Sequence, residues 1–416
     1  MPRGGIALAA FRLDDPELVE AGDPGGMLRQ VASSAAQVRT AVRACDETDL
    51  SALGPDSRPR AIVTAGTGGS AFAGDALAAI CGAGSPVQVA GVSGYQLPGW
   101  VGAADLVIAV SRSGQTAEVL ALAAEAARRG CDLVGVAAPG SPLQDLTLHA
   151  RGTFIPVIAD GPARVTPWAL TVPLLVTASR LGMARVDPAA YEAAAVAMED
   201  ISHQCRPASE SFVNPGKSLA LDIVGTLPVI LGGSDLAAVA ARRFATQLAV
   251  NAKCPSVSGV LPEAGHDQVA TFDGPFAPTP EPEFPEAEDL RSAAPFGDEA
   301  FGAAAFSELP DPDGAGLDGS AGGGTALRLF LLADPAGEPP AVTRVRTAAA
   351  TLAAARGVEV SEIEMDPGEP LRRLTSTVQL LDYATVYLGI ACGIDPLAIA
   401  AIKDLRDLAE RSVPSG

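Results

Sequence analysis

The chain contains Gly66-Thr67-Gly68-Gly69-Ser70-Ala71-Phe72-Ala73-Gly74-Asp75 directly after the apolar run 61–65. This order predicts a buried strand, a glycine turn and then a helix. Such a turn leaves backbone N–H groups pointing at one spot, and the helix dipole makes that spot positive. We therefore expect a phosphate-bearing ligand at this turn.

Two alternatives remain open from this stretch alone. Glycine turns occur in many α/β loops for steric reasons, and Gly66, Gly68 and Ala71 also satisfy the dinucleotide-binding fingerprint. A dinucleotide site needs an acidic residue about 20 positions further on, which holds the ribose. The next predicted strand, 86–92, ends in Val89-Ala90-Gly91-Val92 and offers no carboxylate. A dinucleotide is therefore a minor alternative.

A second hydroxyl-rich loop favours phosphate. It reads Ser111-Arg112-Ser113-Gly114-Gln115-Thr116, between the apolar run 106–110 and a helical stretch at 117–129. Its three hydroxyls can hydrogen-bond phosphate oxygens, and the helix N-terminus adds N–H donors. Helix capping by Ser113 or Thr116 would explain one hydroxyl but not the cluster.

These two loops resemble the sugar isomerase (SIS) domain, and the whole chain resembles the bifunctional phosphoglucose/phosphomannose isomerase family. The resemblance covers about residues 55–273 and 327–410. It implies an α/β fold with two SIS-type domains, each a parallel sheet flanked by helices. It also implies aldose–ketose isomerisation of a hexose 6-phosphate through an enediolate, with no cofactor.

The pattern of elements agrees with a duplicated α/β architecture. Strands predicted at 61–65, 86–92, 105–110 and 132–137 alternate with helices, as in a parallel sheet whose ligands sit at the carboxyl ends of its strands. A strand at 227–231, the turn Gly232-Gly233-Ser234 and a helix at 236–251 repeat this plan. Further elements are predicted as strands at 327–332 and 358–363 and helices at 167–181, 188–204, 342–356, 371–392 and 396–410.

We expect three divisions of the chain. Residues 1–50 form an N-terminal helical segment with an amphipathic helix over 16–46, residues 51–205 the first SIS domain and residues 206–416 the second. Proline, glycine, alanine and acidic residues dominate 275–325. Such a composition offers little apolar surface to bury, so we expect a flexible insertion there.

Composition and charge exclude several classes of partner. The chain has 416 residues, 49 acidic and 29 basic, for a formal net charge of −20. This charge disfavours nucleic acids and anionic membranes, and a phosphate site must therefore be locally positive. The sequence shows no apolar stretch of transmembrane length, no convincing signal peptide, and six scattered cysteines that suggest buried hydrophobes rather than disulfides or a metal site. We expect a cytoplasmic protein.

The resemblance assigns the ligand-binding residues. The phosphate cradle would comprise Gly68, Gly69, Ser70, Ser111, Ser113, Gln115 and Thr116, with Gln115 in place of the family's usual Asn. Arg164, in Asp160-Gly161-Pro162-Ala163-Arg164, would stabilise the enediolate. The plain alternative for Arg164 is a solvent-exposed arginine at a helix start.

The resemblance also assigns the acid and base groups, with one departure. His266, in Pro262-Glu263-Ala264-Gly265-His266-Asp267, would open the sugar ring from the neighbouring subunit of a homodimer, although a lone histidine is more often structural. The family's proton-transfer glutamate falls on Val250, in Val250-Asn251-Ala252-Lys253, and valine accepts no proton. Glu263 is a substitute base, and the family's C-terminal lysine falls on Lys403 or Arg406.

Two functions from different classes follow. The first is a family-like isomerase acting on a hexose 6-phosphate. The second is a catalytically impaired sugar-phosphate sensor or regulatory protein, and Val250 is the residue that separates the two.

Overall fold

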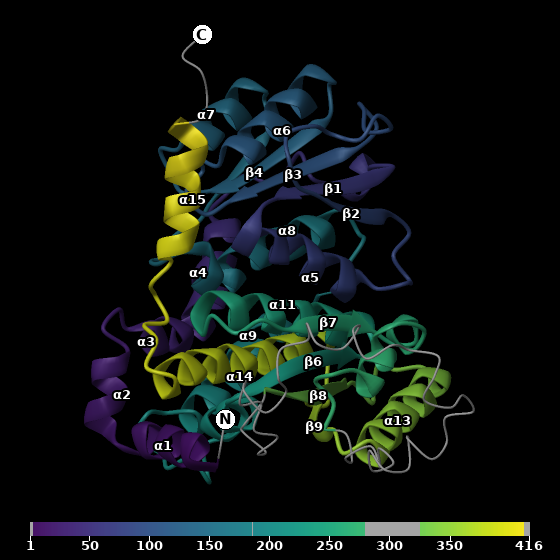
Figure 1. Cartoon of the computed structure of the whole chain (residues 1–416). Coiled ribbons are helices and arrows are strands. Elements are labelled where there is room, and N and C mark those ends of the chain that lie inside the picture. The colour runs from purple at the N-terminus through teal and green to yellow at the C-terminus, as the bar shows by residue number, and fades with distance from the viewer. Residues whose placement is uncertain (1–2, 185, 279–324, 412–416) are drawn as a thin grey trace, which may run out of the picture.

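The chain folds into two α/β units, each built on its own parallel sheet (Figure 1). The computed structural model describes residues 3–184, 186–278 and 325–411. The first sheet has the order β2-β1-β3-β4-β5, and all its neighbouring strands are parallel. Its strands are β1 Ala61–Gly66, β2 Gln88–Val92, β3 Leu106–Ser111, β4 Asp132–Ala137 and β5 Thr153–Pro156. The second unit has the same character, so the predicted fold class is confirmed.

Strands β1 and β3 are buried along their whole length, as expected of central strands covered by helices on both faces. Successive side chains enter different cores: Ile62 and Ile108 belong to one cluster, Val63 and Val107 to the other. Figure 1 shows α6 and α7 on one face of the sheet and α5 and α8 on the opposite face. These helices are α5 Ala71–Cys81, α6 Ala117–Arg128, α7 Pro142–His149 and α8 Pro167–Arg180.

The second sheet has the order β7-β6-β8-β9 and is also parallel. Its strands are β6 Thr226–Gly232, β7 Val257–Val260, β8 Ala326–Ala333 and β9 Glu359–Glu364, and its helices are α10 Pro215–Ile223, α11 Asp235–Asn251, α13 Pro340–Ala355 and α14 Pro370–Ala391. The edge strand β7 was not predicted, because four residues between Pro255 and Pro262 carry too weak a period-two signal.

The N-terminal segment differs from the prediction. It forms α1 Arg3–Asp14, α2 Pro16–Gly22, α3 Met27–Ala32 and α4 Ser34–Asp46, so the single helix expected over 16–46 was wrong. The break has a local cause: the Asp23 carboxylate accepts hydrogen bonds from the N–H groups of Met27 and Leu28, and Gly26 adopts a φ of +63°. The side-chain periodicity continues across this turn, which is why the sequence suggested one helix.

Three further expectations concern the last helix, the insertion and the cysteines. The helix expected at 396–410 is α15 Ala400–Arg411. Most of the insertion expected at 275–325 lies outside the described residues. Of the cysteines, Cys392 is exposed rather than buried.

No helix in the described part of the chain is long and apolar enough to span a membrane, and no group of three or more potential metal-ligating side chains gathers there.

A buried lysine ties the N-terminal helices to the second unit. Lys217 of α10 is 1% exposed, and its Nζ donates to the carbonyls of Leu13, Pro207 and Ser209 at 2.5, 2.8 and 2.7 Å. Its ammonium also lies 5.7 Å from the centre of the Tyr387 ring. These three hydrogen bonds hold the C-terminal end of α1 against α10 of the second unit.

We expect Lys217→Met to lower the free energy of unfolding by about 3 kcal/mol, because three carbonyls lose a charged donor while the packing volume is kept. Urea unfolding followed by circular dichroism measures the change. Lys403→Met, on an exposed face of α15, is the control and should alter stability by no more than about 0.5 kcal/mol. Equal effects of the two substitutions would contradict a stabilising role for the hydrogen bonds between Lys217 and the three carbonyls.

Candidate functional site

A cleft of about 470 Å³ lies between the two units. Its walls come from the turn after β1, the segment before α8, one face of α11 and the start of α15. The lining residues are Gly68, Gly69, Ala71, Phe72, Asp75, Pro162, Ala163, Arg164, Val239, Arg242, Arg243, Thr246, Gln247, Val250, Ile399, Ile402 and Arg406. Four arginines and a single carboxylate make this cleft positive in a chain whose net charge is −20.

The first glycine turn packs directly against the segment that carries Arg164. Gly68 adopts a φ of +59°, which favours glycine. A Cβ added to Gly69 would lie 2.8 Å from the backbone nitrogen of Arg164, so a side chain there would push the two segments apart. Ser70 is buried at the start of α5. The glycines thus set the distance between the turn and Arg164.

The second loop lies beside the first. Gly66 of β1 pairs with Val110 of β3, so the loops that follow leave the same edge of the sheet. The Ser111 and Thr116 hydroxyls are 2.9 Å apart, and Ser111 Oγ accepts the N–H of Gly114 at 3.1 Å. Thr116 makes no side-chain cap to α6, which removes one of the two capping alternatives. Ser113 and Gln115 are exposed.

Arg164 is half-buried in the cleft wall. Its Nη2 donates to the carbonyl of Leu397 at 2.9 Å. Burial lowers the pKa of Arg164, and the nearby Asp395 opposes that effect. No carboxylate forms an ion pair with Arg164 among the residues that the structure describes. Its charge is therefore available to an anion in the cleft.

A buried network holds the backbone of Arg164 from the second unit. Arg243 of α11 donates from Nε and Nη2 to the Asp382 carboxylate at 3.0 and 2.6 Å, and its Nη2 also donates to the Arg164 carbonyl at 2.8 Å. Gln247 Nε2 donates to the same carbonyl at 3.1 Å. The Arg243 guanidinium lies 4.7 Å from the centre of the Phe72 ring of α5. Sequence reasoning missed this network.

Val250 is placed in the same cleft, on the last turn of α11. Lys253, just after α11, connects this turn to the segment before α15, because its Nζ donates to the carbonyls of Val250 and Ala398, both at 2.7 Å. Burial and then the charge of Arg164 lower the pKa of Lys253, while Asp395 opposes them. Of the two C-terminal candidates, Arg406 lines the cleft and Lys403 is not among its lining residues.

His266 and Glu263 lie elsewhere in the same chain. Both are exposed around the short helix η4 Glu263–Gly265, which follows β7. A small hollow links the end of β7 at Val260 to Ala238, near the first turn of α11. Ala238 and Val250 are separated by about 18 Å along the helix axis. Neither His266 nor Glu263 is among the residues that line the cleft in this chain.

Asp75 is a cleft residue that the sequence reasoning quoted but did not assign. Its carboxylate is 3.1 Å from Arg242 Nη1 of α11, so the pair bridges the two units. Among the described residues that line the cleft, it is the only carboxylate. The four-residue spacing of Ala71 and Asp75 was the available signal, because residues at that spacing share one face of α5.

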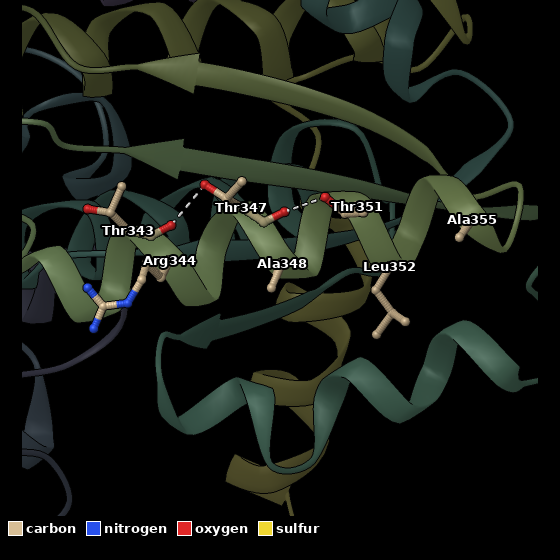
Figure 2. A pocket seen from close by; sticks show the side chains of 7 residues that line it. All are labelled: Thr343, Arg344, Thr347, Ala348, Thr351, Leu352 and Ala355. Carbon is tan, nitrogen blue, oxygen red and sulfur yellow. Dashed lines mark hydrogen bonds between the residues drawn. The ribbon is translucent and has the colours of Figure 1, made fainter.

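A larger hollow of about 620 Å³ lies along α13 but offers no comparable chemistry. Figure 2 shows Thr343, Thr347 and Thr351 in a row along the helix. The hydroxyls of Thr347 and Thr351 donate to carbonyls one turn earlier, at 3.0 and 2.9 Å. Arg344 is its only ionisable lining residue in the described chain. The cleft between the units is therefore the stronger candidate.

Two family models match this chain, and they cover both units. The SIS domain matches residues 57–165, and the bacterial phospho-glucose isomerase C-terminal SIS domain matches residues 212–408. The first match contains both hydroxyl-rich loops, and the second contains α11, α14 and most of α15.

Two curated relatives carry the name bifunctional phosphoglucose/phosphomannose isomerase. The protein of Caldicellulosiruptor bescii is 27% identical over 214 residues, which is 51% of this chain and 63% of the relative. That of Aquifex aeolicus is 28% identical over 185 residues, which is 44% of this chain and 53% of the relative. The matched part thus spans less than two thirds of these relatives.

Solved structures support the fold over nearly the whole chain. A hypothetical protein of Thermus thermophilus has a TM-score of 0.65 at 16% identity and covers 99% of this chain and 95% of its own. A glucose-6-phosphate isomerase of Chlamydia trachomatis has a TM-score of 0.64 at 13% identity, covering 98% and 87%. These similarities at low identity show the fold alone. The curated relatives make the chain similar to the bifunctional phosphoglucose/phosphomannose isomerases. The two domain matches, which together cover most of the chain, show that it belongs to the SIS-domain proteins and that its second unit is of the bacterial phospho-glucose isomerase C-terminal type.

Proposed function

We propose that this chain binds a hexose 6-phosphate in the cleft between its two units and interconverts its aldose and ketose forms. The observation that carries the proposal is a cleft with four arginines that is lined by Gly68 and Gly69 of the first glycine turn, in a chain of net charge −20. The second loop leaves the same edge of the sheet, although its residues are not among those that line the cleft. A local positive field is what an anionic ligand requires there. The names of the curated relatives point to the same class of substrate.

The chemistry divides among the residues as follows. The turn at Gly68, Gly69 and Ser70 and the loop from Ser111 to Thr116 bind the phosphate. Isomerisation moves a proton between C1 and C2 through a negatively charged enediolate, which Arg164 stabilises from the cleft wall. Arg406 contributes a second cation, in the role that the family gives to a lysine.

The proton-transfer base is the step that Val250 leaves open. Loss of a positioned base costs about 10²–10⁴-fold in rate, so we expect slow turnover. Asp75 is the carboxylate already in the cleft, and its Oδ2 lies 3.1 Å from Arg242 Nη1. Glu263 is the second candidate and would enter together with His266 from another chain.

A homodimer accounts for the position of His266. The histidine is exposed and does not line the cleft of its own chain, so a second copy would present it to the cleft. We also propose the cytoplasm as the compartment, because sugar phosphates are charged and stay where they are made.

The second candidate function is a sugar-phosphate sensor that binds without turnover. One specific observation favours it: Val250 lines the cleft at the position where the family places its base. The two functions differ in whether bound ligand exchanges protons with solvent.

Proton NMR of fructose 6-phosphate in D₂O with the purified protein separates these functions. We expect deuterium to enter at the carbon next to the carbonyl, together with aldose, and Arg164→Ala to abolish both. Asp75→Asn and Glu263→Gln then identify the base, because only the variant lacking it stops exchange. Ligand broadening without any exchange would favour the sensor, and the absence of both would refute the proposed ligand.

We expect Val250→Glu to raise the exchange rate by about 10²-fold or more, because it restores a carboxylate at the family's base position. The matched control is Thr246→Glu, one turn earlier on α11 and also lining the cleft. The same assay measures both variants. A similar rate for the two would mean that a carboxylate at 250 has no special position.

A mixing experiment tests the shared site. Arg164→Ala and His266→Ala should each be inactive, but a mixture that exchanges subunits should recover about a quarter of the wild-type rate, since one site of each mixed dimer is intact. Mixing Arg164→Ala with Ser113→Ala is the control, because the proposal assigns both residues to the site of their own chain, so no mixed dimer would contain an intact site. No recovery in the first mixture would place His266 outside the partner's site.

A further inference from the structure

The second unit repeats the strand framework of the first. Strands β6, β7, β8 and β9 have the same order as β1, β2, β3 and β4. Gly66 pairs with Val110 across β1 and β3, and Gly232 pairs with Leu332 across β6 and β8. Because Leu332 occupies the position of Val110, the residues that follow it, Ala333–Glu338, correspond to Ser111–Thr116 of the first unit. The turn Gly232-Gly233-Ser234 likewise stands beside it, as the first glycine turn does.

The two frameworks carry opposite chemistry at this place. The first loop offers the hydroxyls of Ser111, Ser113 and Thr116, whereas the second reads Ala333-Asp334-Pro335-Ala336-Gly337-Glu338. By the strand register, Glu338 replaces Thr116 and Asp334 replaces Arg112. Hydroxyls suit a bound anion, but carboxylates supply the negative charge themselves.

The carboxylates occupy the space at the second glycine turn. A Cβ added to Gly233 would overlap the Glu338 carboxylate, so that group lies directly against the turn. Asp334 Oδ2 accepts the hydroxyl of Ser234 at 2.6 Å, at the N-terminus of α11. The Asp334 side chain is fully buried and that of Glu338 is 1% exposed.

Two buried arginines complete an anion-binding frame. Arg346 Nε donates to both oxygens of Glu338 at 3.1 Å, and Arg373 pairs with Asp334. Both arginines are less than a tenth exposed. Gly233 and Arg346 contact the Glu338 carboxylate, and Ser234 and Arg373 contact Asp334. A glycine turn, a serine hydroxyl and two buried guanidinium groups thus surround these two carboxylates, and the same kinds of group bind phosphate.

We propose that the Glu338 carboxylate is an internal anion that fills a second phosphate-type site, and that its removal opens this site to inorganic phosphate. Wild-type chains then take a single phosphate, in the cradle of the first unit. The comparison with the first unit's cradle rests on the proposed function. The proposal that Glu338 fills a phosphate-type site in the second unit does not depend on it.

Equilibrium dialysis with radiolabelled inorganic phosphate tests this in the full chain. We expect one phosphate per wild-type chain and two per chain of Glu338→Ala. Phosphate should also raise the melting temperature of the variant more than that of the wild type, by about 5 °C at a concentration near 100 times Kd and constant ionic strength. The matched control is Glu362→Ala, which removes the other carboxylate bound to Arg346 and leaves Glu338 in place; it should bind as the wild type does.

The outcomes separate the two proposals. No phosphate in the wild type but one in Glu338→Ala would support the filled site and count against the proposed cradle. Equal numbers in the wild type and Glu338→Ala would overturn the filled site. If Glu338→Ala does not fold in chloride buffer, its refolding is measured in phosphate buffer, where recovery of the folded state would support the filled site. Glu338→Thr, which introduces the residue type found at the matching position 116 of the first unit, is the second variant for the same measurement. Failure of both in phosphate as in chloride would also overturn the inference.

Discussion

The ion pair between Arg243 and Asp382 is the contact on which the cleft depends. It is buried, it joins α11 to α14, and through Arg243 Nη2 it also holds the carbonyl of Arg164 at 2.8 Å. Breaking one partner of such a pair costs about 3–5 kcal/mol, because a buried charge is left uncompensated. The position of Arg164 in the first unit is therefore fixed by residues of the second. The pair itself lies within the second unit, and the hydrogen bonds of Arg243 and Gln247 to the Arg164 carbonyl are what join it to the first unit.

The ion pairs around the cleft also determine which of its four arginines remain without a carboxylate partner. Arg243 is neutralised by Asp382 and Arg242 faces Asp75, which leaves Arg164 and Arg406 as the cleft cations without a carboxylate partner among the described residues. A half-buried arginine interacts more strongly with an anion than an exposed one does, because less water screens its charge. Arg164 therefore contributes most to the local field, and Arg406 adds to it from the rim.

The sequence was informative where function depends on local order. Both hydroxyl-rich loops follow neighbouring strands of a parallel sheet, so their proximity could be predicted from strand spacing alone. Arg243, Gln247 and Asp382 could not be found this way, because they meet through the packing of two helices more than 130 residues apart. The turn at Asp23 was also hidden, since a side-chain cap leaves the hydrophobic period unchanged. Tertiary partners decide the positions of Arg243, Gln247 and Asp382, whereas a local side-chain cap decides the turn at Asp23.

If the two proposals hold, duplication of the framework explains why one chain needs only one ligand cradle. The same strand register presents hydroxyls in the first unit and carboxylates in the second. A buried arginine needs a counter-charge in both cases, and a ligand supplies it only where the loop does not. A unit whose anion is covalently attached stays folded without ligand, and it can serve as the rigid support for α11 and α14. The unit that lacks its own anion is then the one free to respond to a phosphosugar.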